Sequence, residues 1–254
     1  MAPAWTASYA PRRYFMPAEV QSAPGHRSPF FRIAIDGPAA GGKSSTARTL
    51  AARLGFRYVD TAAMTEDARF AFMLDAPPAT ASDVLRPPRV RVTVNAEDVT
   101  EEIRSPVVTR AVAAIARLPT VRARMLQKQR AFGTARETSA PGLVMDGRDI
   151  GSVVFPDAEL KVFLTAQLEA RAQRRFRELM AKQPTPLTPA EQEAAYNALV
   201  ADIQARDQSD EKRAVSPLIR ASDAVLLDTS SMSFAEQVAA IEHLVRARMT
   251  PSPQ

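Results

Sequence analysis

The sequence contains no cysteine and only two histidines, His26 and His243. Disulfide bonds, thiolate metal sites, iron–sulfur clusters and a cysteine nucleophile are therefore excluded, and so is a metal site built from several imidazoles. No apolar run approaches the roughly 18 residues that a membrane-spanning helix needs, so no membrane partner is expected. Any catalysis must use carboxylates, hydroxyls, lysine or arginine.

A strong excess of charge of one sign is missing as well. The 254 residues include 33 Lys and Arg against 28 Asp and Glu, which gives a formal net charge of +5. Such a balance is typical of a mixed, solvated surface, so we do not expect nucleic-acid binding, although a phosphorylated small molecule would use the same arginines. With 46% hydrophobic residues the chain has the composition of a folded globular protein, in one large domain or two small ones.

Residues 1–29 differ from the rest of the chain. They carry prolines without periodic apolar spacing, at Pro3, Pro11, Pro17, Pro24 and Pro29. We expect a disordered tail there and a folded domain over residues 30–250. The segment lacks the continuous apolar stretch of a secretory signal. A mitochondrial presequence is an alternative, because Arg12 and Arg13 lie in a segment with few acidic residues, although its helical amphipathicity is poor.

From Phe31 onward, strand patterns alternate with helix patterns. The apolar runs of strand length are residues 31–36, 56–60, 143–146, 160–164 and 224–228. A helical spacing of apolar residues begins at Lys43 and is followed by Gly55, a residue typical of a helix C-terminus. Ser233 and Glu236 have the spacing of a capping box at the start of the last helix. Buried strands separated by helices predict an α/β fold with a parallel five-stranded sheet and helices on both faces.

Two further segments interrupt this alternation. Residues 65–118 have the pattern of a small insert, in which valines alternate with polar residues between Pro87 and Val94 and predict a half-exposed strand. A proline-rich break at residues 183–189 separates two helical segments, 168–182 and 190–206. We predict that residues 168–206 form a hinged helix pair.

A glycine-rich loop carries the most specific chemical signal. Residues 37–44 match G-x-x-x-x-G-K-[ST] in full, directly after a buried strand and directly before a helix. Backbone N–H groups of such a loop surround phosphate oxygens, and the helix N-terminus adds partial positive charge. Lys43 would reach the β- and γ-phosphates and the Ser44 hydroxyl would bind Mg²⁺. The predicted triphosphate site consists of Gly37, Pro38, Ala39, Ala40, Gly41, Gly42, Lys43, Ser44 and Ser45.

Arginines and aspartates gather at three further places. Asp146 ends a strand and is followed by Arg148 and Asp149, which form either part of the ligand crevice or a loop ion pair. Arg171, Arg174 and Arg175 share a helix face, which is either solvated or part of a lid that orders arginines over the transferring phosphoryl group. Arg206, Asp210 and Arg213 fall on one helix face if the helix persists, and either pair with each other or bind sugar hydroxyls and a base edge.

Phosphoryl transfer to a phosphate monoester suits this set of residues. The acceptor is already an oxyanion, so no general base is strictly required and the scarcity of histidine is no obstacle. Positive charge is needed instead, because several phosphates must be held in line.

The order of these segments closely resembles bacterial cytidylate kinase from about Ile33 to Val245. The resemblance is carried by IAIDGPAAGGKSS, YVDTAAM, NAEDVTEEIR, GRDIGSVVFPDA, EARAQRR and RDQSDEKRAVSPL. It implies a P-loop nucleoside monophosphate kinase fold with a small acceptor-binding insert and an arginine-rich lid. It also implies a cytoplasmic, monomeric enzyme of pyrimidine nucleotide metabolism that uses ATP and Mg²⁺ to phosphorylate CMP or dCMP.

The resemblance also implies residue roles. Arg148 would contact the acceptor phosphate, and Thr61 matches a position of the same site. The cytosine would be bound by Arg122, Asp149 and Arg213, and the pentose by Arg206 and Asp210. Lys43, Arg148 and the lid residues Arg171 and Arg174 would form the catalytic set.

The acceptor segment departs from the family pattern. DTGAMYR of the family appears here as DTAAMTE, so that Glu66 replaces a phosphate-binding arginine and Thr65 a tyrosine. Ala113 replaces a serine that contacts the base, and the insert is short. The alternatives are therefore an active (d)CMP kinase with an altered acceptor pocket, a nucleotide-binding regulatory module without that activity, and a kinase for another small acceptor.

Overall fold

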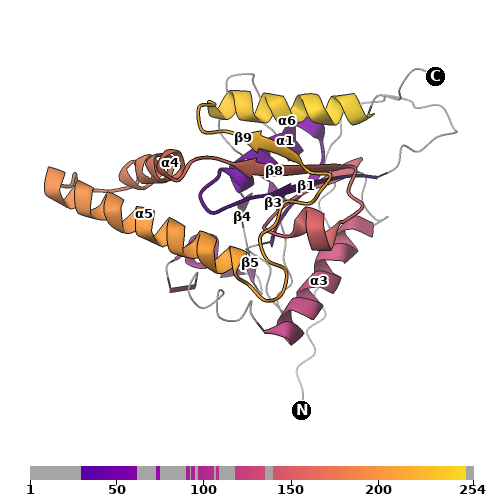
Figure 1. Ribbon diagram of the computed structural model, residues 1–254, viewed down its shortest axis with the longest axis horizontal. Coiled ribbons are helices and arrows are strands. Elements are labelled where there is room, and N and C mark those ends of the chain that lie inside the picture. The colour runs from indigo at the N-terminus through magenta and orange to yellow at the C-terminus, as the bar shows by residue number, and fades with distance from the viewer. Residues whose placement is uncertain are drawn as a thin grey trace, which may run out of the picture.

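The central element of the computed structural model is a five-stranded sheet in which all neighbouring strands are parallel (Figure 1). The structure describes residues 30–61, 73–74, 90–91, 93–94, 97–105, 107–108, 118–134 and 140–249. The strands are β1 (Phe31–Asp36), β2 (Arg57–Asp60), β7 (Gly142–Asp146), β8 (Leu160–Thr165) and β9 (Val225–Asp228), in the order β2-β7-β1-β8-β9. Each of the five predicted strands is confirmed to within one residue at either end.

Helices cover both faces of the sheet, as predicted. On one face, α1 (Lys43–Leu54) and α6 (Phe234–Met249) contribute Leu50 and Ile241 to a core that also contains Ile33 and Ile35 of β1. On the other face, α3 (Pro119–Thr134) and the π-helical turn η4 (Ile150–Val154) pack over Ala34 and its neighbours. Successive residues of β1 thus enter different cores, because side chains alternate along a strand.

The sheet order places β1 in the middle. Ile35 is in register with Asp146 of β7, and Asp36 with Phe163 of β8. Since parallel strands end at the same edge, the loops that follow β1, β2, β7 and β8 converge there, which is where doubly wound sheets bind ligands.

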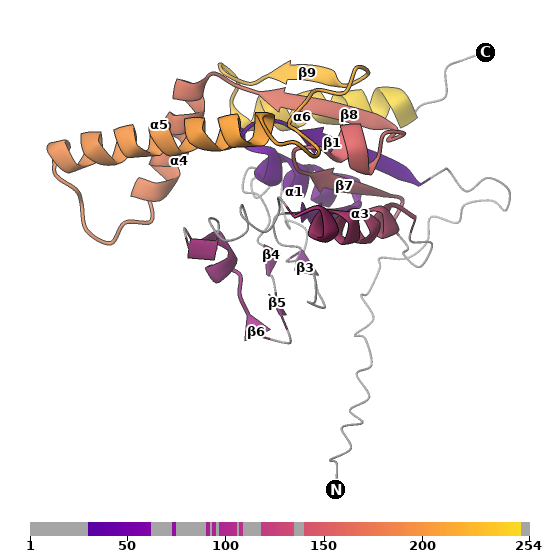
Figure 2. The same cartoon turned by 60° about the horizontal axis from the view of Figure 1, so that its bottom comes forward.

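A hairpin of two helices extends beyond this edge (Figure 2). It consists of α4 (Leu168–Met180) and α5 (Pro189–Glu211), joined by residues 181–188. Thr188 and Glu191 form a capping box at the start of α5. The prediction that this helix ends at residue 206 is wrong: no proline or glycine interrupts the next turn, and the helix continues to Glu211.

The predicted insert is described only in short pieces. These are β3 (Met73–Leu74), β4 (Val90–Arg91), β5 (Thr93–Val94), β6 (Glu97–Asp98) and the 3₁₀ turn η3 (Glu102–Arg104). β4 pairs with β3 and β5 with β6, both antiparallel, so the single strand predicted up to Val94 is divided between two ladders.

Several predictions fall outside the described residues. They concern the tail at residues 1–29, most of the insert at 65–118, and the substitutions Thr65, Glu66 and Ala113. Within the described part of the chain, no helix is long and apolar enough to cross a membrane.

Candidate functional site

The loop after β1 has the geometry of a phosphate-binding loop. Gly37 has φ 147°, and an added Cβ would lie 2.0 Å from the carbonyl oxygen of Leu164 on β8, so only glycine fits there. Gly42, with φ 80°, precedes α1, and no side chain of the described residues caps that helix. The first N–H groups of α1 are therefore available to an anion.

Lys43 is the first residue of α1, and its side chain reaches back to this loop. Its side chain is only 5% exposed, and its ammonium group donates a hydrogen bond to the carbonyl oxygen of Pro38 at 2.6 Å. Burial lowers the pKa of Lys43, and the positive charge of Arg148 lowers it further, while Asp146 and Asp36 act in the opposite direction. A phosphate dianion at this place would stabilise the charged ammonium form.

Asp146, at the end of β7, joins the phosphate-binding loop to the neighbouring strands. It accepts hydrogen bonds from the Ser44 hydroxyl at 2.7 Å and from the Tyr58 hydroxyl at 2.8 Å. Burial raises the pKa of Tyr58 well above its ordinary value, and the negative charge of Asp146 adds to this effect, so Tyr58 stays a donor. Thr61, after β2, donates to the backbone carbonyl of Asp146 at 2.7 Å.

Asp36 was not singled out in the sequence, yet it fixes the loop that carries Arg148. Its two carboxylate oxygens accept hydrogen bonds from the backbone N–H groups of Ile150 (2.8 Å) and Gly151 (2.7 Å). Burial raises the pKa of Asp36 to about 6, although these two N–H donors favour the ionised form. The available signal was a carboxylate at the end of a buried strand, directly before the glycine-rich loop.

Five of the predicted substrate-binding residues form an arginine–aspartate cluster: Arg122, Arg148, Asp149, Asp210 and Arg213. Arg122 of α3 bonds to Asp149 at 2.5 Å, and Arg148 bonds to Asp210 of α5 at 2.6 Å. Arg213 lies 3.8 Å from the same Asp210. Its buried Nη2 atom has no hydrogen-bond partner within the described residues.

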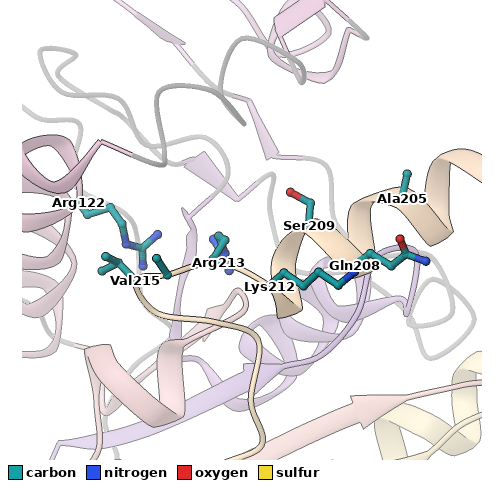
Figure 3. Close-up of a pocket in the computed structure, with 8 residues that line it drawn as sticks. Arg122, Ala205, Gln208, Ser209, Lys212, Arg213 and Val215 are labelled. Carbon is teal, nitrogen blue, oxygen red and sulfur yellow. The ribbon is translucent and has the colours of Figure 1, made fainter.

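A pocket of about 540 Å³ opens beside this cluster (Figure 3). Arg122 lines it from α3, and Gln208, Ser209 and Arg213 line it from α5 and the turn that follows. A larger cleft of about 960 Å³ contains the glycine-rich loop. It is lined by the cations Lys43, Arg148, Arg174, Arg175, Arg177 and Arg206, and by Ser44, Thr61 and Asp146 among others.

The structure separates one of the arginines predicted to act together on the lid from the other two. Arg174 lines the cleft and donates to the hydroxyl of Thr229 and to the carbonyl of Met232, both at 3.1 Å. Arg175 also lines the cleft, where it pairs with Glu178. Arg171, in contrast, is 7% exposed and lies on the face of α4 that packs against α5. From there its guanidinium group donates to the carbonyl of Ala39 in the phosphate-binding loop.

A glycine-rich loop at the central strand of a parallel sheet, a serine–carboxylate pair beside it and a helix hairpin over a cationic cleft together define a P-loop kinase. The family model for cytidylate kinase matches residues 33–247, and the chain belongs to the cytidylate kinase family. The cytidylate kinase of Chloroherpeton thalassium is 42% identical over 224 residues, which cover 84% of this chain and 92% of that protein. The cytidylate kinase of Pelotomaculum thermopropionicum is 44% identical over 217 residues, covering 80% and 90%.

Likeness to solved structures is more remote. The shikimate kinase of Bacteroides thetaiotaomicron has a TM-score of 0.44 and 14% identity, with 85% of this chain and 98% of that chain covered. The family assignment rests on the sequence matches.

Proposed function

We propose that this protein transfers the γ-phosphate of ATP to CMP or dCMP, yielding ADP and CDP or dCDP. The observation that carries the proposal is the arginine–aspartate cluster, which lies next to a phosphate-binding loop in a member of the cytidylate kinase family. A cytoplasmic location, a monomeric state and a role in pyrimidine nucleotide metabolism stay predictions that accompany it.

On the donor side, the glycine-rich loop and the N-terminus of α1 bind the triphosphate of ATP. Lys43 supplies its charge where the β- and γ-phosphates lie, and its burial strengthens the attraction because little water screens it. Arg174 and Arg206 line the same cleft from the helix hairpin. Closure of the hairpin over bound nucleotide would exclude water, which otherwise competes as the phosphoryl acceptor.

The donor set also suits Mg²⁺. This ion takes oxygen ligands and is usually held by one or two carboxylates together with substrate phosphates. Ser44 Oγ and Asp146 Oδ2 lie 2.7 Å apart at the rim of the cleft and are the residues that would hold it. When bound, the ion would neutralise charge that develops on the phosphate oxygens.

On the acceptor side, Arg148 faces the cleft and is held by Asp210. It binds the acceptor phosphate, whose oxygen attacks the γ-phosphorus while the bond to the β-phosphate oxygen breaks. No residue needs to remove a proton, because the attacking oxygen is already ionised. Arg122, Asp149 and Arg213 present both donors and acceptors to the cytosine edge, and Arg206 and Asp210 bind the pentose.

A second candidate follows from the sequence. Glu66, where the family has a phosphate-binding arginine, would repel a dianionic acceptor, and this favours a protein that binds ATP without phosphorylating CMP. The two candidates differ in turnover and not in ATP binding.

The test is a coupled assay of ADP formation with CMP, dCMP, UMP, AMP and GMP as acceptors, run beside the Lys43→Met variant. We expect turnover with CMP and dCMP that exceeds turnover with the purine monophosphates and is lost in Lys43→Met. A thermal shift with ATP but no turnover with any acceptor would overturn the proposal in favour of the binding module. Turnover with a purine monophosphate alone would indicate a different acceptor.

A further inference from the structure

A buried ion pair joins the helix hairpin to the phosphate-binding loop. Asp207 of α5 and Arg171 of α4 are 9% and 7% exposed, and their side chains meet at 2.6 Å. Asp207 accepts a hydrogen bond from the backbone N–H of Ala39 at 2.8 Å, and Arg171 donates to the carbonyl of the same residue at 2.7 Å. A further bond links Arg171 to the carbonyl of Ala166 at 2.9 Å.

Both polar groups of Ala39 are thus held by side chains from outside the loop. The next residue, Ala40, has φ 56°, a left-handed conformation that is unfavourable for a residue with a Cβ. Such a conformation persists only where the surroundings determine it, and the two bonds to Ala39 fix the peptide groups immediately before it. The turn that leads from β1 towards Gly42 therefore depends on α4 and α5.

Packing reinforces the same contact. Ala39, Ala172 and Ile203 form a small buried cluster, with Ala40 and Leu199 packed against it. Burial of an ion pair is a poor source of stability, since desolvation offsets much of the attraction. An apolar pair would serve the packing of the hairpin equally well. What an apolar pair cannot supply is the acceptor and the donor that Ala39 uses.

We propose that Arg171 and Asp207 are positioning residues that hold the phosphate-binding loop in its nucleotide-binding conformation. This inference rests on the proposed function in one respect, which is that the bound nucleotide is ATP. Asp210 lies three residues after Asp207 on α5 and bonds to Arg148 instead. The C-terminal end of α5 consequently contributes to both substrate sites. Asp207 holds the phosphate-binding loop that would bind ATP, and Asp210 holds Arg148, which would bind the acceptor phosphate.

The test replaces the pair without leaving a buried charge, in the double variant Arg171→Met/Asp207→Leu. Affinity is measured calorimetrically with the β,γ-imido analogue of ATP, and steady-state kinetics give KM for ATP and for CMP. We expect the Kd of the analogue and the KM for ATP to rise about tenfold or more, because two hydrogen bonds to the loop are lost. The KM for CMP should change less than twofold, with the circular dichroism spectrum retained.

Asp210→Asn provides the opposite contrast, since it should raise the KM for CMP more than the KM for ATP. Glu193→Gln, on the exposed side of α5, is the matched control and should alter neither constant. A Kd for the analogue within twofold of the wild-type value would overturn the proposal. Equal increases in both KM values for the double variant would also overturn it, because they would indicate a general structural role.

Should the double variant fail to fold, Arg171→Lys keeps the charge opposite Asp207 while its single ammonium cannot make all three contacts. A severalfold increase in the Kd of the analogue is expected, and an unchanged Kd in this folded variant would contradict the inference. Because analogue binding requires no turnover, the result is independent of CMP phosphorylation. If the wild-type protein proves inactive but the variants show the expected changes in Kd, the proposed function is refuted and the positioning role is not.

Discussion

The buried carboxylate of Asp36 lets us predict whether the free energy of unfolding rises or falls with pH. Its pKa is raised from an ordinary 3.8 to about 6, and burial is the largest cause. Between these two values the folded chain keeps a proton that the unfolded chain has lost. The free energy of unfolding contributed by this group therefore falls as the pH rises from about 4 to about 6, and it is constant above that window.

The size follows from the difference between the two pKa values. Each pKa unit corresponds to about 1.36 kcal/mol, so the effect approaches about 3 kcal/mol as an upper bound. Asp36→Asn removes the titration, at the expense of turning one acceptor oxygen into an NH₂ group that faces a backbone N–H. We expect the variant to be less stable than the wild type at every pH, by an amount that shrinks by up to about 3 kcal/mol between pH 4 and pH 7.

The assay is urea denaturation of both proteins across this pH range, with Glu193→Gln on the surface of α5 as the control. Other carboxylates titrate at acidic pH as well, among them Glu159; burial raises its pKa, but hydrogen bonds from Arg32 outweigh burial and leave the pKa below its ordinary value. These contributions cancel in the difference between wild type and variant. A difference that stays constant with pH, or that grows towards pH 7, would refute the reasoning and mean that the N–H donors outweigh burial.

Five further substitutions test the site and the core. Lys43→Met should reduce turnover roughly 10²–10³-fold with an unchanged circular dichroism spectrum, because it removes a preorganised charge. Leu50→Ala, at a fully buried position, should lower the free energy of unfolding by about 2–5 kcal/mol in urea titrations, and a smaller loss would contradict close packing around Leu50. Arg122→Met leaves Asp149 without its partner and should raise the KM for CMP about tenfold while the KM for ATP is unchanged. From the sequence, Glu66→Arg should lower the KM for CMP and Arg69→Ala should raise it; if neither does, this segment does not contact the acceptor.

Local signals predicted most of the fold because the relevant interactions are close in the sequence. Gly55 adopts φ 66° and ends α1, and its N–H bonds to the carbonyl of Ala51. Ser233 and Glu236 make the reciprocal bonds of a capping box at 2.8 and 3.3 Å. The parallel sheet follows from the alternation of strands and helices and the glycine-rich loop from its motif, whereas the strand order was not predicted.

From residue spacing alone, the site could be predicted only where the motif itself specifies the contact; the arginine–aspartate cluster was expected from the family resemblance. Helical spacing placed Arg171 and Arg174 on one face, yet whether that face meets solvent, ligand or another helix depends on packing between residues far apart in the chain. Asp207 lies 36 residues from Arg171, and sequence spacing alone gave no reason to pair them. Asp36 was missed for the same reason, since its partners begin 114 residues later.

Among the described residues, the bonds that join the helix hairpin to the phosphate-binding loop and to Arg148 lie near one end of the hairpin. Asp207, Asp210 and Arg171 all lie near this end, and residues 189–194 at the start of α5 are exposed. Turns inserted between residues 181 and 189 would therefore leave these bonds unchanged, provided that matching turns of about 3.6 residues are added to both helices. The loop at residues 181–188 is accordingly a natural place to graft a peptide tag or a fluorescent reporter that senses movement of the hairpin.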